Sequence, residues 1–216
     1  MSGAKLLDSF LESQDRGSHR SQKKLAKIVR EAYPIGVPAM IMKSSTDRLG
    51  ASAGYSFHLG TPDDLLRRVA SWLLTRSEGK HRVLCKLISL LWERHGREDV
   101  ALAALLLANI DHTDLGTNPW RILASSINPT EPAEALLLSV EELTRAGYAM
   151  PSKEMLNGWC GGRLVESHLA LFSVHAACNL GLEIDEEIIA LIASVEIPDG
   201  DSLLGRIRER VVSCGP

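Results

Sequence analysis

The sequence predicts an all-α protein, built as a right-handed superhelical stack of antiparallel helix pairs, that is, an α-solenoid. A short apolar phrase rich in Leu, Ala or Ile recurs at residues 103–108, 135–140, 169–174 and 189–194. Each copy lies in a stretch with helical spacing near Gly, Pro or Asn, whereas no stretch alternates as a strand does. Recurrence at intervals of roughly thirty residues is typical of helical repeats, because one helix pair cannot bury its core alone.

The length of the chain is that of one domain. At 216 residues, we expect a single α-helical repeat domain over 1–216. Basic helices and a loop occupy 1–58 within it, and helical repeats occupy 59–216. The chain is 45% hydrophobic and only 5% aromatic, a composition that suits helices packed on helices.

The first 58 residues predict two amphipathic helices, over 4–15 and 20–32. Arg16-Gly17-Ser18 separates them, and the prolines and glycine of 33–38 end the second. A short helix over 39–48 follows, and then a loop over 50–56 that is rich in Gly, Ala and Ser.

Helix-boundary residues divide the rest of the chain. Thr61-Pro62-Asp63 predicts a helix start, with Thr61 as the cap, for a helix that ends near Ser77. Further helices are expected over 80–95, 97–110, 119–127, 131–146, 152–160, 163–180, 184–195 and 200–213. Gly96 is expected to end the helix over 80–95, and 111–118 is rich in turn residues.

The sequence gives no sign of a membrane segment. No apolar run approaches the ~20 residues that a spanning helix needs, and the N-terminus lacks the apolar core of a signal peptide. We therefore expect a cytoplasmic protein without membrane contact. The four cysteines form no CxxC pair, which favours free thiols.

Charge is divided unevenly along the chain. Residues 1–100 contain 17 Lys and Arg against 11 Asp and Glu, whereas 101–216 contain 7 against 16. The basic half is the candidate for contact with phosphates, although an ordinary solvated surface would show the same counts. The residues assigned to this contact are Lys23, Lys24, Lys27, Arg67, Arg68 and Arg82.

A second candidate for phosphate contact is Trp159-Cys160-Gly161-Gly162-Arg163. Two glycines before a helix expose backbone N–H groups that can hold a phosphate, and Arg163 adds charge. The alternative is a turn that joins two helices, with Trp159 as its apolar plug.

Two other groups of polar residues are candidates for chemistry. His175 and Cys178 have metal-ligand spacing on one helix, but nothing identifies a full tetrahedral set, so no metal and no cofactor are expected. Asp111 and His112 lie in a turn, where they could form a base and its carboxylate or simply cap a helix.

Residues 59–109, about a quarter of the chain, resemble the DNA alkylation repair proteins that are built from HEAT-like helical repeats. The residues that carry the resemblance are Gly60-Thr61-Pro62-Asp63 before Leu65-Leu66-Arg67, then Leu91-Trp92, then Arg97-Glu98 with Ala101 and Ala104. The resemblance implies a glycosylase that excises positively charged alkylated bases from duplex DNA without a metal.

The resemblance also implies site residues. Trp120 and Trp159 would face an exposed base or sugar, Glu134 would stabilise the developing sugar cation, and Arg163 would hold phosphate. Trp120 and Glu134 are thus the candidate catalytic residues. The Trp-Trp-Asp-x-x-Asp helix start of the family has no match in this chain, so catalysis stays open.

Two other classes of function remain. A non-enzymatic scaffold would bind a protein partner in its concave surface, and the acidic second half would suit a basic partner. An enzyme of another class would use a site that no motif reveals.

Overall fold

All regular structure in the described part of the chain is helical. The computed structural model describes residues 2–48, 54–77 and 79–214, and within these ranges the elements are α-helices and one 3-10 turn. The all-α prediction is therefore confirmed. The helices expected from the sequence are present, with ends within three residues of the expected ones. An unexpected short helix, α7 (His112–Leu115), lies in the segment that was expected to contain only turns.

The chain divides into two compact units, Met1–Ile122 and Leu123–Pro216. The boundary between the units lies inside a helix, and the single repeat domain over 1–216 stays a prediction. Helices from both sides of residue 58 contact one another within the first unit.

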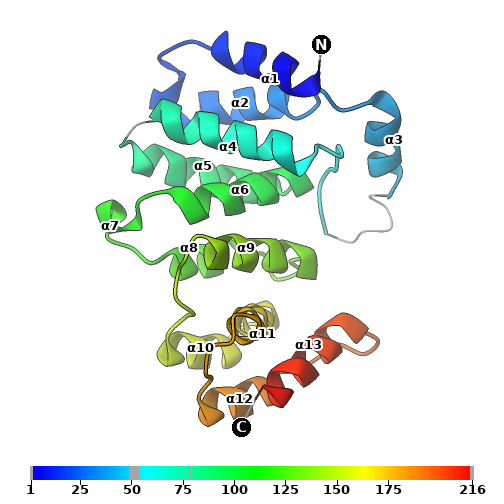
Figure 1. Ribbon diagram of the computed structural model, residues 1–216, viewed down its shortest axis with the longest axis vertical. Helices are drawn as coiled ribbons and strands as arrows, with labels where there is room; N and C mark the ends of the chain where they lie inside the picture. The colour runs from blue at the N-terminus through cyan, green and yellow to red at the C-terminus, as the bar shows by residue number, and fades with distance from the viewer. Residues whose placement is uncertain (1, 49–53, 78, 215–216) are drawn as a thin grey trace. The chain divides into compact units, whose positions relative to one another are not determined.

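The first unit contains α1 (Gly3–Glu12), η1 (Ser18–Arg20), α2 (Gln22–Ala32), α3 (Ala39–Arg48), α4 (Asp63–Ser77), α5 (His81–Arg94), α6 (Arg97–Asn109) and α7. Helix α4 contacts α1 and α6, and α2 contacts α5, as Figure 1 shows. Helix α5 also contacts α6 and α7. The expected loop over 50–56 falls partly outside the described residues.

Helix α6 is the centre of the first unit. Residues 98–108 are all buried, and α4 and α5 both pack against this helix. Leu102, Leu106 and Leu107 have no solvent exposure, and neither have the carboxylate residues Glu98 and Asp99 in its first turn. Two buried acids beside the apolar run 100–108 need partners inside the protein.

The junction between α5 and α6 differs from its prediction. Gly96 was expected to end the preceding helix, but His95 takes the left-handed conformation there, with φ of 56°, and Gly96 is extended. A Cβ atom at residue 96 would overlap the ring of Phe57. The glycine is thus needed because the Phe57 ring approaches its backbone closely, and not because the position requires a positive φ.

The second unit contains α9 (Ala133–Arg145), α10 (Lys153–Cys160), α11 (Leu164–Asn179), α12 (Glu186–Ala193) and α13 (Ser202–Ser213); α8 (Pro119–Ser126) crosses the boundary between the units. Helix α11 contacts α9, α10, α12 and α13, which explains why it is apolar nearly all round. Among the described residues, no helix is long and apolar enough to cross a membrane.

Candidate functional site

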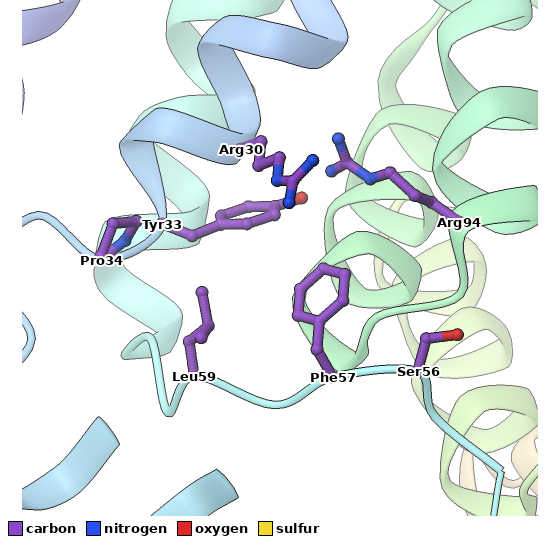
Figure 2. Close-up of a pocket in the computed structure, with 7 residues that line it drawn as sticks. All are labelled: Arg30, Tyr33, Pro34, Ser56, Phe57, Leu59 and Arg94. Atoms are coloured by element: carbon purple, nitrogen blue, oxygen red, sulfur yellow. The ribbon is translucent and has the colours of Figure 1, made fainter. Parts of the chain in front are cut away.

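A pocket of about 510 Å³ lies in the first unit. Its lining comes from three places in the sequence: Arg30, Tyr33 and Pro34 at the end of α2, Ser56, Phe57 and Leu59 before α4, and Arg94 at the end of α5 (Figure 2). Tyr33 is fully buried and forms the floor, whereas Arg30, Pro34 and Ser56 are exposed.

Residues 55–61, called the strap below, are held against the α5–α6 junction. The Ser56 N–H donates to the carbonyl oxygen of His95 at 2.8 Å, and the Arg97 N–H donates to that of Phe57 at 2.9 Å. The carboxylate oxygen Oε1 of Glu98 then accepts the N–H groups of Leu59 and Gly60, both at 2.9 Å, and of Thr61 at 3.3 Å. Helix α6 therefore positions the strap through one buried carboxylate.

The strap also contacts the floor of the pocket. The Thr61 hydroxyl, expected to cap α4, donates to the Tyr33 carbonyl oxygen at 3.0 Å. The ring of Phe57 lies on the backbone of Gly96 and 6.4 Å from the ring of Tyr33, centroid to centroid. These contacts fix the orientation of the Phe57 ring beside the pocket.

A buried polar network supports the floor. The Tyr33 hydroxyl donates to Oδ1 of Asp99 at 2.8 Å, and Nε of Arg94 donates to Oδ2 of the same carboxylate at 2.7 Å. Nη2 of Arg94 also pairs with Asp99, and Nη1 donates to the carbonyl oxygen of Ala26 at 3.0 Å. The Arg94 side chain thus joins α5, α6 and α2.

Burial and the charges of this network shift the pKa values of Tyr33 and Arg94. Burial, together with the charge and hydrogen bond of Asp99, raises the pKa of Tyr33 well above its ordinary range. Burial would lower the pKa of Arg94, but its hydrogen bond and ion pair with Asp99 outweigh burial and raise it. At neutral pH the network therefore contains a neutral phenol and a compensated ion pair.

Arg30 is the uncompensated charge at the pocket. Its side chain is exposed, and no carboxylate among the described residues pairs with it. Figure 2 shows the guanidinium groups of Arg30 and Arg94 directed toward the same end of the pocket, near the hydroxyl of Tyr33. Phe57 and Leu59 lie at the other end.

The basic residues that the sequence assigned to phosphate contact separate into groups. Lys23, Lys24 and Lys27 are exposed on α2, and Arg82 is exposed on α5, which packs against α2. The exposed residues of these two helices in contact are together called the α2–α5 surface below. Lys27 makes only a weak, exposed pair with Glu31, at 3.9 Å.

Arg67 and Arg68 lie elsewhere, on α4. Arg67 pairs with Asp63 at 2.7 Å, and Arg68 pairs with Asp8 of α1 at 3.0 Å. Their positive charges are thus partly offset by carboxylates of the same unit, in contrast to those of Lys23, Lys24 and Arg82.

The two tryptophans assigned to base contact are buried. Trp120 in α8 is 3% exposed, and Trp159 in α10 is 8% exposed. Glu134 is exposed in the first turn of α9, and it belongs to the second unit, whereas Trp120 belongs to the first.

Arg163 holds structural contacts. Its guanidinium donates to the carbonyl oxygens of Ala124 at 3.0 Å and Ile127 at 3.1 Å, and pairs with Glu166 at 2.8 Å. The Glu166 carboxylate accepts the Arg163 N–H in return, which caps α11. A Cβ atom at Gly162 would overlap that carboxylate, so the glycine serves a turn between two helices.

The remaining polar groups also have structural partners. Asp111 accepts the N–H groups of Thr113 and Asp114 and so caps α7, while the ring of His112 hydrogen bonds to the Leu107 carbonyl oxygen. No group of three or more potential ligands that could hold a metal occurs among the described residues. His175 and Cys178 are therefore not accompanied by a ligand set there.

Sequence reasoning missed most of the pocket. Tyr33 was interpreted as part of a helix end, and Phe57 was not singled out. The available signal was Glu98-Asp99 directly before the uninterrupted apolar run 100–108, because buried acids require buried donors. Apart from Arg94, those donors lie 37 to 66 positions away from the acids in the sequence.

Comparisons with known proteins provide no family for this chain. No family model matches it, and neither the curated proteins nor the solved structures include a significant match.

Proposed function

We propose that this protein is a nucleic-acid-binding helical-repeat protein that contacts phosphates through the α2–α5 surface. These two helices carry six exposed basic side chains and only two exposed acids, Glu31 and Glu93. The basic set is Lys23, Lys24, Lys27, Arg30, Arg82 and Lys86. This excess on two helices in contact is the observation that carries the proposal.

The proposal includes the finer architecture and the resemblance found in the sequence. It describes the helices as a right-handed superhelical stack of antiparallel pairs, similar to the HEAT-like repeats of DNA alkylation repair proteins, in a cytoplasmic protein. Support comes from the contacts of α4 with α1 and α6, and of α2 with α5, in the first unit. Stacked helices present equivalent faces side by side, which suits the repeating charge of duplex DNA.

The proposal assigns no excision step. A tryptophan that is 3% exposed offers almost no ring surface to a base, so Trp120 and Trp159 do not support contact with a lesion. If excision does occur, Glu134→Gln tests the implied role of that carboxylate. Unchanged excision would remove Glu134 from the mechanism.

The test is fluorescence anisotropy with a labelled blunt DNA duplex over a salt series. Each lysine that contacts a phosphate adds about one unit to the log–log salt slope. Lys23→Gln/Lys24→Gln is expected to weaken binding and reduce the slope by about two. Arg67→Gln/Arg68→Gln is the matched control: it removes equal charge from α4, where carboxylates already pair with it.

Two results would overturn the proposal. One is no binding to the duplex at low salt, and the other is an equal loss of affinity for the duplex in both double variants.

The second candidate, a scaffold for a basic protein partner, rests on the second unit, which combines an acidic excess with exposed Leu164, Leu180, Leu182 and Leu203. Binding to that unit should resist moderate salt better than phosphate contacts do.

A further inference from the structure

The pocket beside the α2–α5 surface combines a positive end and an apolar end. We infer that it holds one unpaired nucleotide of a bound strand, with the phosphodiester against Arg30 and Arg94 and the base against Phe57. This inference rests on the proposed function, because the α2–α5 surface brings the strand to the pocket. Beyond the proposed function, the inference predicts that the protein prefers DNA with unpaired nucleotides over a fully paired duplex.

The positive end matches a single negative charge. Arg94 is compensated by Asp99, so Arg30 supplies the one excess charge at the pocket. Each terminal nitrogen of a guanidinium carries two protons, so Arg94 keeps donors beyond those used on Asp99 and Ala26. A phosphodiester carries one negative charge and accepts such charge-assisted hydrogen bonds.

The apolar end suits a planar base. Phe57 and Leu59 line it, and bases that are not paired stack readily on aromatic side chains. The contact with Gly96 and the two backbone hydrogen bonds of the strap hold the Phe57 ring in place. A wall that is already ordered binds without an entropic cost for ordering it. The volume of about 510 Å³ lies within the usual range for small-ligand sites.

The pocket continues the α2–α5 surface. Lys23, Lys27 and Arg30 are spaced by four and three residues, so they lie along one face of α2. A strand whose phosphates contact Lys23 and Lys27 therefore reaches Arg30 next. An unpaired nucleotide of that strand can enter the pocket at this point.

The experiment compares three probes by anisotropy and fluorescence. They are a blunt duplex, the same duplex with a short single-stranded overhang that carries 2-aminopurine, and free adenosine monophosphate. Two variants change the pocket, Arg30→Gln and Phe57→Leu. Arg82→Gln is the matched control, because it removes one exposed charge from the same surface outside the pocket.

We expect the overhang probe to bind at least about fivefold more tightly than the blunt duplex, with a change in 2-aminopurine emission on stacking. Arg30→Gln and Phe57→Leu should abolish that preference, whereas Arg82→Gln should weaken both duplex probes equally. Arg30 is exposed and unpaired among the described residues, so its variant should fold even if the Phe57 variant does not.

Three outcomes would overturn the inference, and they can be told apart. Equal binding of both duplexes, unchanged by Arg30→Gln, would reject the pocket and leave the proposed function intact. Binding of neither duplex at low salt would reject the proposed function and this inference with it. Arg30-dependent binding of adenosine monophosphate alone would replace the strand with a free nucleotide.

Discussion

The hydroxyl of Tyr33, at the end of α2, donates a 2.8 Å hydrogen bond to Oδ1 of Asp99, a fully buried carboxylate in the first turn of α6. The two residues are 66 positions apart, and Arg94 binds the same carboxylate from α5. One side chain thus receives donors from two other helices. The floor of the pocket and the core of the first unit depend on the same network.

The first prediction concerns this hydrogen bond. Tyr33→Phe keeps the ring but removes the donor, and we expect the free energy of unfolding to fall by about 1–3 kcal/mol, as for other hydrogen bonds to charged groups. Urea denaturation followed by circular dichroism measures the change. Asp99→Asn should cost more, because Arg94 then keeps a half-buried charge without its ionic partner. Equal stability of Tyr33→Phe and wild type would contradict the network.

The second prediction concerns Gly96. In Gly96→Ala the new methyl group overlaps the Phe57 ring, and we expect a loss of about 1–3 kcal/mol in the free energy of unfolding from overpacking. A smaller side chain in the double variant Gly96→Ala/Phe57→Leu should restore part of that loss. Thermal melts of the four proteins form a double-mutant cycle. Additive effects would show that the ring does not rest on Gly96.

The third prediction concerns pH. Burial lowers the pKa of His112 and of His175 below the ordinary value of 6.5, and the charge of Arg210 adds to the effect at His175. The unfolded chain therefore binds more protons than the folded one in this range, and stability should fall as the pH drops below about 6.5. Urea midpoints from pH 7.5 to 5 should show this decrease, and His112→Gln/His175→Gln should reduce the slope. A slope equal to that of wild type would exclude both residues as its source.

The fourth prediction concerns the thiols. Cys214 is exposed, whereas burial and a hydrogen bond with Cys214 raise the pKa of Cys178 to about 12, and burial raises those of Cys85 and Cys160. Because the thiolate is the reactive form, titration of the native protein with a thiol reagent at pH 8 should show one fast thiol and three slow ones. Cys214→Ser should remove the fast phase, and a fast phase that persists would contradict the assignment.

The fifth prediction separates structural from phosphate contacts at Arg163. Its guanidinium binds two backbone carbonyl oxygens and Glu166, so Arg163→Ala should lower the free energy of unfolding by about 1–2 kcal/mol. Affinity for the DNA duplex should stay within about twofold of wild type, since these groups are already occupied. A large loss of affinity in a variant of normal stability would restore the phosphate role that the sequence suggests.

Local patterns account for what could be predicted of the fold. Spacing of apolar residues and boundary residues such as Gly17 and Pro62 located the helices, because these signals depend on neighbours within one or two turns. The basic character of the helices in residues 1–58 followed from composition. The short helix α7 was missed, because four residues are too few to show a period.

By itself, the sequence determined that this protein is helical, where its helices begin and end to within three residues, and that the first half of the chain carries the excess of positive charge. Only the tertiary structure decided which polar residues are available for binding. It paired Arg67 and Arg68 with carboxylates, turned Arg163 toward two carbonyl oxygens, and buried Trp120. It also brought Arg30, Phe57 and Arg94 together around Tyr33. The physical reason is that a side chain's charge and stacking surface are offered to a ligand only where packing leaves them unpaired, and packing joins residues that the sequence keeps far apart.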